Sequence, residues 1–173
     1  MAEGTSLFRS TPDASNPASY TAAQFHPDGF LLGCGTKAGA VEVWDARAGK
    51  WAVPSPLSCD AAVTAMAFSE NGYHLATACE TAVQVWDLRK LKCVHSVDFA
   101  GRGTPKGVAF DLGAQFMAVA ADSVAVFAAK KWDALGELSG LPSKGATAVA
   151  FGAKAAKVFV GAADHKLRVY SAE

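Results

Sequence analysis

The residues most able to do chemistry in this sequence are its histidines and cysteines, and their spacing fits no reactive site. The four histidines are His26, His74, His95 and His165. The four cysteines are Cys34, Cys59, Cys79 and Cys93. None of them pairs at the spacing of a zinc site or of a nucleophile with its base. We therefore expect surface or capping histidines, and buried reduced thiols that pack as small apolar residues. The sequence predicts no catalytic residue, no metal and no cofactor.

Two W-D-x-R boxes carry the remaining polar chemistry. They span Trp44–Arg47 and Trp86–Arg89. The aspartate in each box follows a tryptophan, and we expect it to end a strand rather than to act as an acid or a base. Arg47 and Arg89 suit an interface, because the guanidinium fork makes paired, charge-assisted hydrogen bonds. Both arginines are therefore candidate partner-binding residues.

These boxes recur because the chain contains an internal repeat of about forty-two residues. One aromatic landmark ends the first apolar run of each copy: Phe25, Phe68, Phe110 and Phe151. A second landmark ends the third run: Trp44, Trp86, Phe127 and Tyr170. Turn sequences such as Ser69–Gly72 separate the runs. This period, with short strands and a closing Trp-Asp, is typical of β-propeller blades. We predict an all-β propeller of four blades in which the repeated aromatics pack in the core.

The copies divide the chain into an N-terminal segment and four repeats. Residues 1–19 are predicted to hold a strand and a linker, and the repeats are expected at about 20–60, 61–104, 105–144 and 145–173. The outer strands are expected at Lys50–Val53, at Lys92–Asp98 and within Leu135–Leu138, and the fourth copy has none. Ser6–Ser10 has the phase of an outer strand that belongs to a preceding blade.

Composition and charge argue against nucleic-acid binding and against a membrane protein. Hydrophobic residues make up 51% of the chain and charged residues only 18%, which fits sheets that are covered on both faces by neighbouring blades. The formal net charge is +0, which argues against a strongly basic nucleic-acid surface. No apolar run is long enough to span a membrane, and the N-terminus lacks the apolar region of a signal peptide. We therefore expect an intracellular protein that binds neither nucleic acid directly nor membranes.

Four blades could close into a ring or fan out as an arc. In a ring, Ser6–Ser10 would pair with Lys166–Ser171 and remove the free strand edges. In an arc, the blades keep the angle suited to seven, and both ends stay open. A four-fold ring would force a much larger angle at every junction and overpack the contacts. We therefore favour a partial, open arc of a seven-bladed propeller, with self-association through its apolar ends.

Several segments of the chain resemble WD repeats, and the match covers nearly all of it. Gln24–Gly29 (QFHPDG), Ala67–Ala78 (AFSENGYHLATA) and Val85–Lys92 (VWDLRKLK) are similar to the propeller of the pre-mRNA-processing factor 19 family. That family comprises U-box ubiquitin ligases of the spliceosome-associated Nineteen Complex. The resemblance implies a nuclear scaffold that binds proteins or peptide segments, expected to be subunits of a spliceosome-associated complex, in splicing and DNA repair. The U-box and the coiled coil are absent, so we expect no ligase activity from this chain.

Departures from the WD pattern are also visible. The Gly-His dipeptide that usually precedes the first strand is missing from all four copies, and copies three and four replace Trp-Asp by Phe127-Ala128 and Tyr170-Ser171. The usual buried Asp-His-Ser/Thr-Trp network is therefore expected to be incomplete. The W-D-x-R boxes also resemble the box of WD-repeat substrate receptors of cullin-RING ligases, whose arginine helps to contact the adaptor. Such a receptor is the alternative function.

Repeat topology predicts where partners bind. The strands are covered by neighbouring blades, so the loops are the parts that stay accessible to a partner. The connections Pro54–Asp60, Ala100–Lys106 and Gly140–Gly145 should share one rim with the turns around Lys37, Glu80, Asp122 and Asp164. Lys37, Arg102 and Lys144 would give that rim a modest positive bias. We expect it to bind acidic peptide segments.

Overall fold

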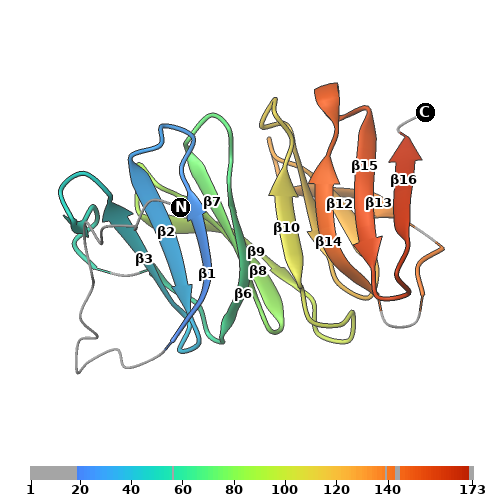
Figure 1. The fold of residues 1–173 in the computed structure, drawn as a ribbon, viewed down its shortest axis with the longest axis horizontal. Coiled ribbons are helices and arrows are strands. Elements are labelled where there is room, and N and C mark those ends of the chain that lie inside the picture. Colours follow the sequence, from blue (N-terminus) through green and yellow to red (C-terminus); the bar gives the residue numbers. More distant parts are fainter. Residues whose placement is uncertain (1–18, 56, 139, 143–144, 172–173) are drawn as a thin grey trace, which may run out of the picture.

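A computed structural model describes residues 19–55, 57–138, 140–142 and 145–171 of the chain. This part is all-β, as predicted, and forms four antiparallel sheets that stand side by side (Figure 1). We call them blades 1 to 4 in chain order. A single short 3-10 turn, η1 (Ala153–Ala155), interrupts the described strands. No helix in the described residues is long and apolar enough to cross a membrane.

Each blade is a meander in which successive strands pair. Blade 1 contains β1 (Tyr20–Phe25), β2 (Leu31–Thr36), β3 (Ala40–Asp45), β4 (Lys50–Trp51) and β5 (Leu57–Ser58). Blade 2 contains β6 (Val63–Phe68), β7 (His74–Cys79), β8 (Ala82–Asp87) and β9 (Lys92–Asp98). Blade 3 contains β10 (Gly107–Phe110), β11 (Phe116–Ala120), β12 (Val124–Ala128) and β13 (Asp133–Leu138). Blade 4 contains β14 (Ala146–Phe151), β15 (Lys157–Ala162) and β16 (Leu167–Ser171).

Short polar side chains close the turns between the first and second strands. In blade 2, the Tyr73 N–H donates to Asn71 Oδ1 at 3.0 Å. In blade 3, the Asp111 carboxylate accepts N–H groups from three residues of the turn, including Phe116 at 2.6 Å. Such side chains replace the missing backbone partners in a tight turn. The tight turn predicted at Ser69–Gly72 is confirmed.

The outer strand of blade 1 differs from the prediction. We expected one strand at Lys50–Val53 followed by a loop, Pro54–Asp60, but the structure has two short pieces, β4 and β5. Both pair with β3, at its two ends. β4 ends at Trp51, and Pro54, which has no N–H to donate to the ladder, lies in the gap before β5. In blade 3 the outer strand is longer than predicted and begins at Asp133.

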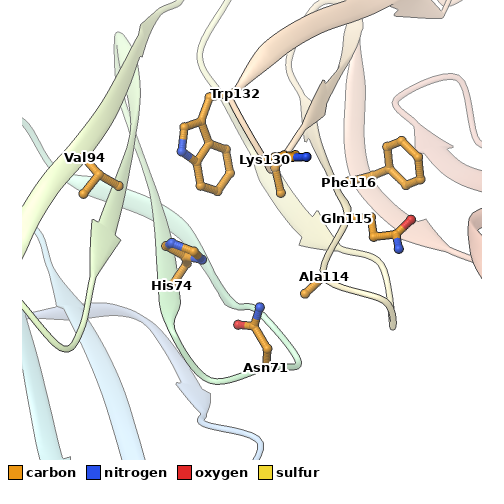
Figure 2. A pocket seen from close by; sticks show the side chains of 9 residues that line it. Asn71, His74, Val94, Ala114, Gln115, Phe116, Lys130 and Trp132 are labelled. Atoms are coloured by element: carbon orange, nitrogen blue, oxygen red, sulfur yellow. The ribbon is translucent and has the colours of Figure 1, made fainter.

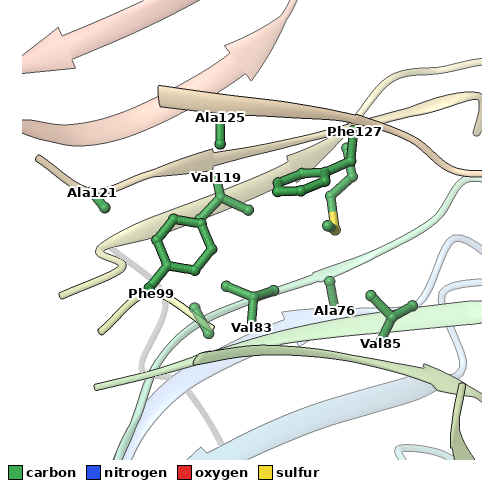
Figure 3. Close-up of a cluster of buried hydrophobic side chains, with 10 residues drawn as sticks. Ala76, Val83, Val85, Phe99, Val119, Ala121, Ala125 and Phe127 are labelled. Carbon is green, nitrogen blue, oxygen red and sulfur yellow. The ribbon is translucent and has the colours of Figure 1, made fainter. Parts of the chain in front are cut away.

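The core consists of three apolar clusters, one between each pair of adjacent blades. Figure 3 shows the central cluster, where Phe99, Val119 and Phe127 face Ala76, Val83 and Val85. Alanines on the inner strands let the sheets approach closely, and the aromatic rings fill the space that is left. Most of the repeated aromatics are buried or half-buried, as predicted. Phe25 is an exception at 56% exposed, because no described blade covers that face of β1.

The blades form an open arc. The innermost strands pack in sequence, β1 against β6, β6 against β10, and β10 against β14. Blades 1 and 4 lie at opposite ends of the row (Figure 1). The arc was the arrangement that we predicted. The strand predicted at Ser6–Ser10, and its pairing in a ring, lie outside the described residues.

Two tryptophans show how the usual WD network is altered. In blade 2, Trp86 Nε1 donates to Thr77 Oγ1 at 3.0 Å, and Thr77 Oγ1 lies 3.3 Å from Cys59 Sγ. A thiol therefore occupies the place of a histidine. In blade 1, Trp44 Nε1 donates instead to Glu42 Oε2 at 2.9 Å. Both indole N–H groups therefore have a partner without the complete network.

All four cysteines are free, and they differ in burial. Cys59 and Cys79 are buried, and Cys34 is half-buried. Burial raises the pKa of Cys34 to about 11. The prediction of buried thiols is wrong for Cys93, which is exposed because it lies on the outer strand β9.

Candidate interaction surface

The turns of the arc gather on two opposite rims. We call the first the crossover rim: it contains the connections between blades and the turns between second and third strands. Main-chain hydrogen bonds hold these loops together, such as Cys59 N–H to Gly39 O at 2.8 Å and Asp122 N–H to Arg102 O at 3.1 Å. The predicted grouping of these loops on one rim is therefore confirmed for the described residues.

The positive charges predicted for the crossover rim are not all free. Lys37 is exposed in the turn between β2 and β3. Arg102 is also exposed, but its Nη1 lies 3.4 Å from Glu137 Oε1. Lys144 lies outside the described residues. An additional ion pair, Arg168 with Asp164 at 2.7 Å, occupies the turn in blade 4. The rim therefore carries paired charges together with exposed charges outside these ion pairs, both basic (Lys37, Lys106) and acidic (Glu80, Asp122).

The opposite edge, which we call the hairpin rim, contains the turns between first and second strands and between third and fourth strands. Arg47 and Arg89 lie here, so the structure does not bring them together with Lys37 and Arg102. Each arginine reaches back to the aspartate of its own box. Arg47 Nη2 lies 3.2 Å from Asp45 Oδ2, and Arg89 Nη2 lies 2.8 Å from Asp87 Oδ2.

An aromatic ring completes each of these arginine units. The Arg47 guanidinium lies 4.1 Å from the centre of the Phe30 ring, and the Arg89 guanidinium lies 4.4 Å from the centre of the Tyr73 ring. Sequence reasoning missed both rings. The signal that could have identified them is an aromatic residue directly after the glycine of the first turn in both copies, Gly29 and Gly72.

The local sequence holds each unit rigidly. Asp87 ends β8, and its Oδ1 accepts the backbone N–H of Arg89 at 2.9 Å in addition to the guanidinium. The arginine therefore stacks on the ring with its fork fixed. The Arg47 and Arg89 side chains remain 63% and 56% exposed, so a partner can still reach them. Each unit can offer its remaining N–H donors and a flat cationic face to a carboxylate or a carbonyl.

Ion pairing sets the protonation of the aspartates. The hydrogen bond from the Arg89 guanidinium holds the pKa of Asp87 well below its usual range. The Arg47 guanidinium likewise lowers the pKa of Asp45. Arg168 lowers the pKa of Asp164 to about 2. These carboxylates are therefore ionised at neutral pH.

We expect acid to destabilise the chain partly through Asp87. Its folded-state pKa lies below the unfolded value of about 3.9, so its contribution is complete above that value and is lost as the pH falls through the folded pKa. Asp87→Asn should therefore be less stable than the wild type at pH 7 and should lose less stability between about pH 5 and pH 3. Urea unfolding midpoints across this range measure it, with Glu70→Gln in the nearby turn as a control. A variant with the wild-type pH slope would contradict the assignment.

Known protein families and curated proteins show similarity to this chain. Residues 55–87, which include the first three strands of blade 2, match the WD domain, G-beta repeat family. The chain is 38% identical over 175 residues to pre-mRNA-processing factor 19 homolog 2 of Arabidopsis thaliana, covering 98% of this chain and 32% of that protein. It is 35% identical to human pre-mRNA-processing factor 19, covering 92% of this chain and 31% of that protein. The chain thus spans about a third of the length of these curated relatives.

Solved structures show the same fold at lower identity. The β-propeller domain of Cps50 (Swd1) from Myceliophteria thermophila aligns with a TM-score of 0.79 at 22% identity, covering 91% of this chain and 53% of that one. The WD40 repeats of RRP9 align with a TM-score of 0.72 at 18% identity, covering 90% of this chain and 52% of that one. The four blades therefore correspond to about half of a propeller in each structure.

Proposed function

Because the chain belongs to the WD-repeat family and is similar over most of its length to pre-mRNA-processing factor 19, we propose that it is a protein-interaction scaffold in pre-mRNA splicing. One observation carries the proposal. The side chains of the strands are buried between adjacent blades, which leaves polar and aromatic groups concentrated on the two loop rims. Loops on a rigid framework are the usual place for recognition. Proteins or peptide segments of a spliceosome-associated complex are the expected partners.

The finer parts of the proposal rest on the resemblance. We propose that the chain works in the nucleus and contributes partner recognition to a ubiquitin ligase pathway and to DNA repair. Ubiquitin transfer itself is not assigned to these residues, which form propeller strands and turns. Binding is the role that the arc suits.

A second candidate function follows from the arginine units. Arg47 and Arg89 are presented on one rim of adjacent blades, in the same pose and with their forks fixed. That arrangement favours a substrate receptor of a cullin-RING ligase, in which these arginines would contact the adaptor.

Capture from a nuclear extract of the source organism separates the two functions. With the purified chain as bait, the scaffold proposal expects splicing-complex subunits in the mass spectrum of the captured proteins. The receptor alternative expects the cullin adaptor, and expects its loss with the Arg47→Ala, Arg89→Ala double variant. Recovery of neither set would contradict both functions.

Charge reversal on the crossover rim should weaken capture. We expect Arg102→Glu to reduce the recovery of acidic partners by roughly tenfold, because an attractive charge becomes a repulsive one at an interface. Glu137→Gln is the matched control, since it breaks the Arg102 ion pair and leaves the arginine charge in place. Unchanged recovery with Arg102→Glu would count against this rim as the binding surface.

A further inference from the structure

A cavity of about 600 Å³ opens on the hairpin rim between blades 2 and 3 (Figure 2). Turns and strands of both blades form its walls, contributing Asn71, His74, Val94, Ala114, Gln115, Phe116, Ala129, Lys130 and Trp132. Its volume lies in the range of sites that bind ligands. Both blades are internal to the arc, so the cavity does not depend on either of its open ends.

Trp132 forms one wall and sits in an unusual backbone conformation. Its φ is +63°, in the left-handed region that side chains other than glycine rarely adopt. The equivalent positions in blades 1 and 2, Gly49 and Leu91, also have positive φ, at +60° and +50°. Blade 3 thus places the largest side chain where glycine would be free of strain. The left-handed conformation therefore belongs to this turn in three blades, and what distinguishes blade 3 is the indole that it places at the cavity wall.

Two histidines hold the indole in place. His95 stacks on it with ring centres 6.0 Å apart, and His74 meets it edge-on at 5.3 Å. Burial lowers the pKa of His74, so its ring is neutral at neutral pH and adds no charge to the cavity. The wall is therefore a fixed aromatic surface, suited to an apolar side chain.

The polar groups that line the cavity are the Asn71 and Gln115 amides, the His74 ring and the Lys130 ammonium group. Asn71 Oδ1 accepts bonds from Ser69 Oγ at 2.8 Å and from the Tyr73 N–H, which leaves its NH₂ group to point into the cavity (Figure 2). Lys130 is exposed at the wall and forms no ion pair with any described residue. None of the lining residues is acidic. A ligand that brings acceptors and negative charge would complement this set.

We propose that this cavity binds a peptide segment in which an apolar side chain adjoins an aspartate or a glutamate. The apolar group would lie against Trp132, the carboxylate would pair with Lys130, and the Asn71 NH₂ group would donate to a peptide carbonyl. The inference deepens the proposed function and rests on it only in requiring that the propeller binds proteins. A peptide fits better than a nucleic acid, because one lysine and a chain of zero formal charge supply too little positive charge for phosphate backbones.

The test selects linear peptides from a random display library on the purified chain and measures their affinity by fluorescence polarisation. Lys130→Glu reverses the charge in the cavity. Lys131→Glu is the matched control, since it makes the same change one residue along, outside the lining. Trp132→Gly removes the wall and suits the left-handed backbone, and thermal unfolding checks that it still folds. Each selected peptide is also made with its carboxylate replaced by the amide.

We expect selected peptides to share an apolar residue beside an acidic one. Their affinity should fall by roughly tenfold or more with Lys130→Glu and with the amide peptide, and should be unchanged by Lys131→Glu. Equal losses for the two lysine variants, indifference to the amide, or no enriched peptide would overturn the proposal. If Trp132→Gly fails to fold, the proposal is tested by the Lys130→Glu and Lys131→Glu variants and by the amide peptide. Purified components alone are used, so a failure here is distinct from a failure to capture splicing subunits.

Discussion

Replacing Trp86 with alanine should cost about 3–5 kcal/mol of unfolding free energy, the range for a truncated buried aromatic. Trp86 is 8% exposed and belongs to the cluster between blades 1 and 2. Its Nε1 also donates a buried hydrogen bond to Thr77 Oγ1, so the variant loses this bond as well as packing. Against a typical total of roughly 5–15 kcal/mol, this loss could unfold the chain.

Urea unfolding followed by circular dichroism measures the effect. Trp86→Phe is the control, because it removes the bond to Thr77 but keeps much of the apolar volume. We expect it to be clearly more stable than Trp86→Ala. A Trp86→Ala variant that keeps wild-type stability and loses only binding would show that this residue faces a partner.

Gly39→Ala should also be severely destabilising, by about 2–5 kcal/mol. Gly39 has φ +87°, and a Cβ there would collide with the carbonyl oxygens of Cys59 and Ala61. These are backbone atoms of the connection between blades 1 and 2, which Gly39 O also anchors through the Cys59 N–H. The added methyl group would therefore push the connection off its turn.

A matched substitution at a second glycine distinguishes the cost of the steric collision from the cost of the left-handed backbone. Gly29 has φ +73°, and an added Cβ would meet nothing within 4 Å. Gly29→Ala should therefore cost only the conformational penalty, about 1–2 kcal/mol. Unfolding midpoints of the two variants give the comparison. Equal losses would mean that the approach of the connection to Gly39 carries no energetic weight.

Much of the fold was predictable because aromatic residues recur at the same position in each repeat. A period kept by Phe68, Phe110 and Phe151 requires one strand order in each copy, and the resemblance to pre-mRNA-processing factor 19 is confirmed by the curated relatives. The split of the outer strand of blade 1 was missed, because pairing at both ends of β3 depends on where the chain returns after Pro54.

The candidate sites were less predictable, because they combine residues from different turns. Arg89 was identified from its box, but its partner ring, Tyr73, comes from a turn sixteen residues earlier that only the blade brings alongside. The cavity at Trp132 joins turns of two blades, and the left-handed backbone of Trp132 is marked only by its alignment with Gly49 in the repeat. Self-association through the open ends of the arc stays a prediction.

The central claim is that this arc of blades recruits proteins used in pre-mRNA splicing, and an in vitro splicing reaction tests it most directly. The purified chain is added in excess to a nuclear extract of the source organism, and assembled splicing complexes are followed on native gels. The account predicts that the folded chain occupies its partners and slows assembly in proportion to its concentration. Heat-denatured chain, used as the unfolded control, should have no effect. Assembly that proceeds equally fast with the folded chain, the denatured chain or neither would contradict the claim.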